Sequence, residues 1–232
     1  MKSQEEMARY LTQCFVGESP AIVKAREQSR LLSGGQVPVL IHGESGTGKS
    51  LLATLLHKIG PRAASPLLFL SASSLVPTLE EALLFGVAPG AYTGAVHDRE
   101  GILEQARGGT LVIENIEDLS LTLQAKLLRV LEGGDFYRVG ESTVRHTEFF
   151  LIATSSCPPE DLMKQDRVRR DFLFRLKGTV LGLPPLAERK EDLPLLIDHF
   201  MLRLGEKEGR SFTLSRTARD KLQRYPFPGN IR

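Results

Sequence analysis

The chain has 232 residues, of which 41% are hydrophobic and 25% are charged, so it can bury a sizeable core. Its formal net charge of +2 gives no support by itself to a nucleic-acid-binding surface. No apolar run is long enough to span a membrane, and the first residues lack the apolar core of a signal peptide, so the cytoplasm is the expected location. Cys14 and Cys157 lie far apart without metal-ligand spacing and are expected to be reduced thiols.

The first element with clear boundaries is a helix that begins at Ser19-Pro20. The serine is expected to cap the helix and the proline to occupy its first turn. The helix is predicted to run to about Leu32, because Gly34-Gly35 then interrupts it. The apolar run Val37–Ile41 follows and predicts a buried strand.

A glycine-rich segment lies between this strand and a helix-like run. It reads Gly43-Glu44-Ser45-Gly46-Thr47-Gly48-Lys49-Ser50 and fits the phosphate-loop pattern Gly-x-x-x-x-Gly-Lys-[Ser/Thr]. Glycines let backbone N–H groups surround phosphate oxygens, and Lys49 adds a positive charge. Ser50 is expected to offer its hydroxyl to Mg²⁺. An ordinary turn would not need the lysine and serine in this register, so the segment predicts binding of a nucleoside triphosphate.

Short apolar runs continue along the chain and alternate with amphipathic helical stretches. After the first strand, the predicted buried strands are Leu67–Leu70, Leu111–Ile113, Phe149–Ala153 and Thr179–Leu183. Such alternation is typical of a parallel sheet covered by helices on both faces. The sequence therefore predicts an α/β fold.

The third predicted strand has the form of the strand that P-loop ATPases place beside the phosphate loop. In those enzymes it ends in Asp-Glu, of which the Asp helps to hold Mg²⁺ and the Glu polarises the attacking water. Here it ends in Glu114-Asn115. Glu114 keeps a carboxylate for the metal, whereas the Asn115 amide can orient water but cannot take its proton. Glu117 and Asp118 follow and could in principle substitute for the missing carboxylate, but a strand or turn would direct them elsewhere, and a solvated turn is the expected place for both.

A double proline, Pro184-Pro185, marks an expected domain boundary, because it disfavours continuation of a helix or strand. The two expected units are residues 1–183, which bind the nucleotide, and residues 184–232, which are helical. Apolar helical repeats occur near Asp192–Leu204 and Ser215–Arg224. The last residues, Pro226–Arg232, have the form of a turn before another helix. The helical unit is therefore expected to be incomplete and the chain to be a fragment of a longer protein.

One further segment, taken with the phosphate loop, points to a family. It reads Gly90-Ala91-Tyr92-Thr93-Gly94-Ala95 and resembles the Gly-Ala-Phe-Thr-Gly-Ala loop of sigma-54-dependent transcriptional activators, which are AAA+ ATPases. Other matches follow the family's order, namely Leu84-Phe85-Gly86, 124–131, Arg138-Val139-Gly140, 184–192 and 227–232. The resemblance covers nearly the whole chain from about Val16. It implies an AAA+ P-loop NTPase with a small C-terminal helical lid.

The resemblance also implies ligands and partners. In the family the hexapeptide lies at the tip of a loop that projects from a ring and engages the sigma-54 subunit of RNA polymerase according to nucleotide state. Tyr92 replaces the usual Phe but keeps the aromatic face. ATP and Mg²⁺ are the implied ligands, and a ring of six or seven identical or mixed subunits is the implied assembly. DNA contacts are expected from a domain outside this segment.

Several site residues are assigned only through the family's pattern. Arg169 and Arg175 match the arginines that reach the ATP site of a neighbouring subunit, where guanidinium groups stabilise the transferring phosphate. A solvated basic helix face is the alternative for these two. Arg232 matches the second sensor arginine, and Val16 and Gly17 fall where the family cradles adenine.

The sequence departs from the family at four places that concern hydrolysis. Glu114-Asn115 replaces Asp-Glu, Ser71 replaces the Asn that restrains the catalytic Glu, Ser155 replaces the sensor Asn, and Leu83 replaces a Glu. Two functions therefore stay open. One is an ATP-driven remodeller of the sigma-54 polymerase complex with impaired hydrolysis, and the other is a nucleotide-binding regulatory subunit that acts with a competent partner.

Overall fold

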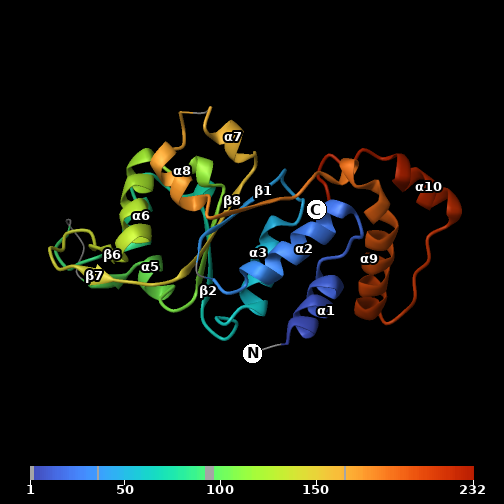
Figure 1. Cartoon of the computed structure of the whole chain (residues 1–232), viewed down its shortest axis with the longest axis horizontal. Helices are drawn as coiled ribbons and strands as arrows, with labels where there is room; N and C mark the ends of the chain where they lie inside the picture. The colour runs from blue at the N-terminus through green and yellow to red at the C-terminus, as the bar shows by residue number, and fades with distance from the viewer. Residues whose placement is uncertain (1–2, 36, 92–96, 165) are drawn as a thin grey trace.

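A five-stranded parallel sheet forms the centre of the protein (Figure 1). The computed structural model describes residues 3–35, 37–91, 97–164 and 166–232. The strand order is β2-β5-β8-β1-β9. The bounds are β1 (Val39–His42), β2 (Leu67–Ser71), β5 (Thr110–Glu114), β8 (Phe150–Ser155) and β9 (Thr179–Gly182). Each predicted strand appears with its ends moved by at most two residues, and the α/β prediction is confirmed.

Helices cover both faces of this sheet (Figure 1). One face packs against α1 (Gln4–Cys14), α2 (Pro20–Leu32) and α3 (Lys49–Ile59). The other packs against α4 (Glu80–Phe85), α5 (Ile102–Gln105), α6 (Leu121–Gly133), α7 (Pro159–Leu162) and α8 (Arg170–Leu176). Short 3₁₀ turns are η1 (Ala72–Ser74), η2 (Ile116–Asp118), η3 (Leu186–Glu188) and η4 (Lys190–Asp192).

Alternation along the central strands decides which side chains meet which helices. Leu111 and Ile113 of β5 pack in the cluster that contains α6 and α8, whereas Val112 packs in the cluster that contains α1 to α3. Successive strand residues point to opposite faces, so an unbroken apolar run fills two cores at once. This is why the strands read as continuous apolar runs.

Helix α1 was not among the predicted elements. Ser3 caps it, with its side chain accepting from the Glu6 N–H while the Glu6 carboxylate accepts from the Ser3 N–H. Met7 and Leu11 are buried against α2 and α3. The helix therefore belongs to the core and brings its last turn to the nucleotide pocket described below.

A small helical unit follows the sheet and contains α9 (Leu193–Glu208) and α10 (Arg216–Arg224). Both predicted helical repeats are present, and α9 extends to Gly209, whose φ of 66° ends it. Leu186, Leu193 and Leu196 form its own small core. Figure 1 places α9 beside α1, and the chain's last residue lies against Gly46. Among the described helices, none has the length and apolarity needed to cross a membrane.

Two short antiparallel pairs form one end of the molecule. They join β3 (Gly86–Val87) to β4 (Arg99–Glu100) and β6 (Asp135–Phe136) to β7 (Arg145–His146). Val87 also bridges Val139, so the two pairs are connected. This β structure flanks both sides of the segment that carries the sequence resemblance to the sigma-54 loop.

Candidate phosphate site

The predicted phosphate loop links β1 to the first turn of α3. Gly46 has a φ of 81° and Gly48 a φ of 111°, conformations that favour glycine. A Cβ on Gly46 would lie 2.2 Å from the Gly229 carbonyl oxygen of the lid. The glycines therefore serve two purposes, because they allow the tight loop and leave room for the lid to approach it.

Lys49 lies over the loop that it is expected to serve. Its Nζ donates to the carbonyl oxygens of Gly43 at 2.6 Å and Glu44 at 3.0 Å. Burial lowers the pKa of Lys49, and the carboxylates of Glu117 and then Glu114 oppose this shift. The ammonium is thus placed at the helix N-terminus, where phosphate oxygens bind in loops of this kind.

Ser50 and Glu114 meet across the sheet edge. The Ser50 hydroxyl donates to the Glu114 carboxylate, which joins the first turn of α3 to the end of β5. A hydroxyl and a carboxylate are hard oxygen donors of the kind that Mg²⁺ takes, together with water and phosphate oxygens. Among the described residues, no three His, Cys, Asp or Glu side chains are grouped to hold a metal by themselves. The pair fits an ion that enters with a nucleotide.

Asn115 lies next to Glu114 in a left-handed conformation with φ of 56°. Its amide donates to the Ser73 hydroxyl at 3.4 Å, not to Ser71, whose hydroxyl contacts that of Ser73. Ser71, Ser73 and Asn115 all line the pocket. Position 71, where the family has its restraining Asn, therefore has a hydrogen-bond path to Asn115 through Ser73, a residue that the sequence pattern did not indicate.

Ser155, at the predicted sensor position, is fully buried and donates its hydroxyl to the Cys157 carbonyl oxygen. Its neighbour Thr154 lines the pocket instead. Alternation along β8 turns successive side chains to opposite sides, so the two residues cannot both face the site. The Ser155 carbonyl oxygen accepts from the Gly43 N–H at 3.2 Å, which ties β8 to the phosphate loop.

The expectation of a solvated turn for Glu117 is wrong. Its Oε1 accepts from the Ser156 backbone N–H at 2.8 Å and from the Ser156 hydroxyl at 2.5 Å. Its Oε2 is buried and has no hydrogen-bond partner in the part of the chain that the structure describes. The adjoining Asp118 is exposed, as expected. The 3₁₀ turn η2 directs these two neighbouring carboxylates to different surroundings.

The lid contacts three successive carbonyl oxygens of the phosphate loop. Asn230 donates to the Ser45 carbonyl oxygen at 2.9 Å and to the Glu44 carboxylate at 3.1 Å. The Ile231 N–H donates to the Gly46 carbonyl oxygen at 3.0 Å, and Arg189 donates to that of Thr47 at 2.9 Å. Sequence reasoning did not identify Asn230 or Arg189 as site residues, because nothing local to either indicates a partner far away in the chain.

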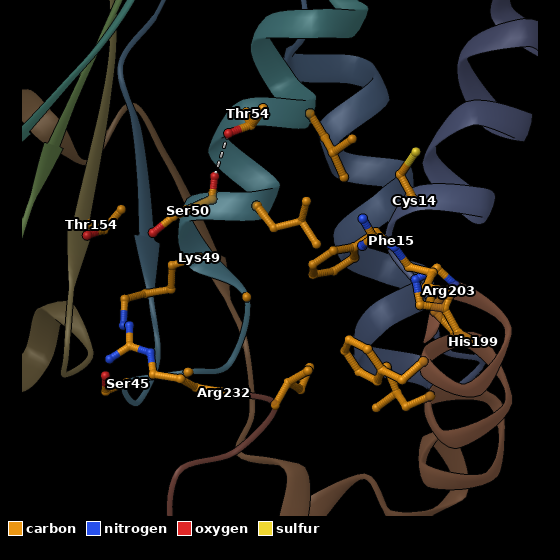
Figure 2. A pocket seen from close by; sticks show the side chains of 18 of the residues that line it. Cys14, Phe15, Ser45, Lys49, Ser50, Thr54, Thr154, His199, Arg203 and Arg232 are labelled. Atoms are coloured by element: carbon orange, nitrogen blue, oxygen red, sulfur yellow. Dashed lines mark hydrogen bonds between the residues drawn. The ribbon is translucent and has the colours of Figure 1, made fainter. Parts of the chain in front are cut away.

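The loop opens into a pocket of about 1080 Å³ between the sheet unit and the lid. Figure 2 shows Lys49 and Arg232 at one end and Phe15, His199 and Arg203 at the other. Apolar side chains such as Phe15 suit a nucleobase, and the cationic end suits phosphates. Val16 lines the pocket as expected, whereas Gly17 lies outside the lining and packs against Asp192.

Arg169 and Arg175 lie outside the lining of their own chain's pocket. Arg169 pairs with Asp171 at 2.7 Å, and Arg175 donates to the Leu131 carbonyl oxygen at 2.6 Å. Both side chains are exposed at the α8 end of the molecule. This placement separates them from the residues grouped at the phosphate loop.

The hexapeptide assigned to sigma-54 contact is only partly described. Gly90 has a φ of 81°, and Ala91 packs against Gly140. Tyr92, Thr93, Gly94 and Ala95 lie outside the described residues, so their assignment stays a prediction.

Comparison with known proteins places the chain in a family. A family model described as the sigma-54 interaction domain matches residues 15–182, and one described as the AAA+ ATPase lid domain matches residues 187–232. The anaerobic nitric oxide reductase transcription regulator NorR of Escherichia coli (strain K12) and that of Shigella flexneri are each 39% identical over 219 residues. These matches cover 94% of this chain and 44% of each relative, so the chain spans less than half of their length.

A solved structure agrees with this placement. The crystal structure of NtrX from Brucella abortus in complex with ATP has a TM-score of 0.83 and 28% identity, covering 98% of this chain and 52% of that one. The sequence matches span both the sheet unit and the lid, and the fold has the parallel sheet and phosphate loop described above. The chain belongs to the sigma-54 interaction domain family and carries an AAA+ ATPase lid domain after it.

Proposed function

We propose that this domain binds ATP with Mg²⁺, hydrolyses it slowly, and couples its nucleotide state to remodelling of the sigma-54 RNA polymerase complex. The observation that carries the proposal is the Ser50–Glu114 pair beside Lys49, with Asn115 next to it in the same pocket. The first three residues suit phosphate and metal binding. The fourth cannot accept a proton from water.

ATP binding is supported by the pocket and by the relative NtrX, whose structures are described as complexes with ATP and with ADP. Ser50 and Glu114 would hold Mg²⁺, and the ion would supply charge neutralisation at the phosphates when it is bound. Lys49 would contact the phosphate oxygens, and Arg232, which lines the same pocket, would add a second positive charge from the lid. Another nucleotide in place of ATP is the alternative ligand, and binding titrations with each nucleotide would distinguish the two.

The partners follow from the family. The loop Gly90–Ala95 would contact sigma-54, and Arg169 and Arg175 would act on the ATP site of a neighbouring subunit in a ring of six or seven members. Their position outside their own pocket supports a role in trans. DNA recognition would come from a segment outside this domain, and the cytoplasm stays the predicted location.

A second function is favoured by the same residue, Asn115. The domain would then be a regulatory or assembly subunit in which ATP is a structural ligand and a competent partner performs the hydrolysis. This function and the first share ATP binding but differ in what limits turnover.

Restoring the carboxylate at position 115 distinguishes the two functions. We expect the double variant Glu114→Asp, Asn115→Glu to raise steady-state turnover by about a hundredfold, because a general base contributes roughly that much or more. ATP affinity, measured by calorimetric titration, serves as the control and is expected to stay unchanged. Turnover of about one per second or faster in the unaltered chain would contradict slow hydrolysis. Unchanged turnover in the double variant, with sigma-54 binding retained, would favour the regulatory subunit.

A further inference from the structure

Two buried charged residues at the start of the lid, Arg189 and Asp192, form an ion pair next to the nucleotide pocket. Their side chains are 1% and 0% exposed, and Arg189 Nη1 lies 3.9 Å from Asp192 Oδ2. Burial lowers the pKa of Arg189, and the Asp192 carboxylate opposes this shift. Arg189 Nε is also buried, without a hydrogen-bond partner among the described residues. Desolvation offsets the attraction within such a pair, so stability alone does not account for it.

Asp192 holds the turn that leads to the apolar end of the pocket. Its Oδ1 accepts from the Glu18 N–H at 2.6 Å and from the Ser19 N–H at 2.7 Å. Its Oδ2 accepts from the Ser19 hydroxyl at 2.6 Å. A Cβ on Gly17 would lie 2.8 Å from this carboxylate, so the glycine leaves the room that Asp192 needs. Asp192 therefore fixes the backbone beside Val16, which lines the pocket.

Arg189 holds one peptide of the phosphate loop. Its Nη2 donates to the Thr47 carbonyl oxygen at 2.9 Å. The C=O and N–H of a trans peptide point in opposite directions, so this bond turns the Gly48 N–H away from Arg189. Gly48 lines the pocket, and its N–H donates to no acceptor among the described residues. Backbone N–H groups at this point of a phosphate loop bind phosphate oxygens.

We propose that Arg189 and Asp192 are positioning residues for nucleotide binding, which fix the phosphate loop relative to the turn at the other end of the pocket. Arg189 acts through the Thr47–Gly48 peptide, whose N–H it directs at a phosphate oxygen. Asp192 orients Arg189 and holds Glu18 and Ser19 in place. This inference rests on the proposed function, because it concerns how the same pocket holds ATP.

The decisive variant is Arg189→Gln, which removes the charge from the bond to Thr47. We expect ATP affinity, measured by calorimetric titration, to fall by about thirtyfold, because a hydrogen bond to a charged group contributes roughly ten- to a hundredfold. Arg189→Lys keeps a cationic donor and should stay within about fivefold of the unaltered chain. Arg219→Gln is the control, because it removes an arginine from a surface pair with Asp198 in the same lid, and it should leave affinity unchanged.

A second variant tests whether the two residues act as a unit. Asp192→Asn keeps an oxygen for the Glu18 and Ser19 N–H groups but leaves Arg189 without its anionic partner. We expect it to lower ATP affinity by about tenfold, and the double variant to lose no more than Arg189→Gln alone, because residues in one network are not additive. Thermal unfolding without ligand identifies the temperature at which each variant is folded. If Arg189→Gln is unfolded throughout, Asp192→Asn and Arg189→Lys carry the test.

The amide resonance of Gly48 separates positioning from general support of the fold. In protein labelled with ¹⁵N-glycine, ATP should shift this resonance in the unaltered chain and in Arg219→Gln, and the shift at saturating ATP should be reduced in Arg189→Gln. A merely structural defect would change how much ATP is needed but not the shift at saturation.

Three outcomes would overturn the inference alone: ATP affinity unchanged in Arg189→Gln or Asp192→Asn, additive losses in the double variant, or an equal Gly48 shift at saturation. Absence of ATP binding by the unaltered chain would instead refute the proposed function, and this inference with it. Titration of the unaltered chain distinguishes the two kinds of failure.

Discussion

At the scale of single residues, the buried side chain of Arg138 is the centre of an ion-pair network near the hexapeptide. The Arg138 side chain is 2% exposed and bonds Glu104 through Nε at 2.6 Å and Nη2 at 2.8 Å. It also bonds Asp98, and Arg145 shares Glu104 and pairs with Glu141. The hydrogen bonds that Arg138 donates to Glu104 are the main reason that its pKa is raised, and the bond that it donates to Asp98 adds to this shift. This network joins the residues that follow the hexapeptide to the β6–β7 pair.

Replacement of Arg138 by Gln should destabilise the domain. We expect the free energy of unfolding to fall by about 3 kcal/mol, because removing one member of a buried ion pair leaves its partner charged and poorly solvated. Urea unfolding measures the change. Arg219→Ala is the control, since Arg219 pairs with Asp198 at the surface, and it should cost less than about 1 kcal/mol. Similar losses in both variants would show that the Arg138 network adds nothing beyond a surface pair.

At the scale of elements, the turn after α10 holds the lid against the phosphate loop. Asn230 is buried in a left-handed conformation with φ of 57°, and its Oδ1 accepts from the Leu186 N–H at 2.7 Å. The same side chain donates to Glu44 and Ser45. One amide thus fixes the start of the lid, its end and the loop between strand and helix. Arg232 follows two residues later, so its position depends on this turn.

Removing the Asn230 amide should weaken nucleotide binding. We expect Asn230→Gly, which tolerates the left-handed backbone, to lower ATP affinity by about tenfold, since the lost contacts are worth roughly 1–2 kcal/mol. Asn230→Ala should lose more, because it adds backbone strain. Calorimetric titration measures both, and Gln223→Ala on the exposed face of α10 is the control. Unchanged affinity in the glycine variant would mean that lid contact does not prepare the loop.

At the scale of the whole molecule, groups suited to phosphate chemistry lie in two separate places. The phosphate loop, Glu114 and Arg232 gather in the pocket, whereas Arg169 and Arg175 lie at α8 outside it. A single chain therefore does not bring all of these residues to one nucleotide. An assembly in which α8 of one subunit faces the pocket of the next would do so.

Mixed assemblies test this arrangement. We expect this domain to stimulate the ATPase of a hydrolysis-competent sigma-54 activator domain, and Arg175→Ala to remove most of that stimulation, because such arginines contribute about a thousandfold or more. Steady-state turnover is measured as a function of mixing ratio. Arg170→Ala, an exposed neighbour on the same helix, is the control. Stimulation retained when both Arg169 and Arg175 are replaced would contradict a role in trans.

Local patterns predicted the framework well. The five strands follow from apolar runs, and the phosphate loop follows from the spacing of its glycines, lysine and serine, with Gly43, Gly46 and Gly48 at positive φ. Helix α1 was not predicted, although Ser3 and Glu6 form a capping box, which is a local signal for the start of a helix. The site was less predictable. Alternation along β8 directs the Ser155 side chain away from the pocket and onto the Cys157 carbonyl oxygen, and the turn η2 directs Glu117 onto Ser156.

The sequence by itself determined that this chain is an α/β nucleotide-binding domain with an altered end to its third strand, because these properties depend on residues close together in the chain. Only the tertiary structure decided what completes the site. Asn230 reaches Glu44 across 186 residues, and Arg189 reaches Thr47 across 142. Glu117 meets Ser156 only because β5 and β8 are neighbours in the sheet. Such contacts depend on strand order and lid docking, and no local pattern encodes either.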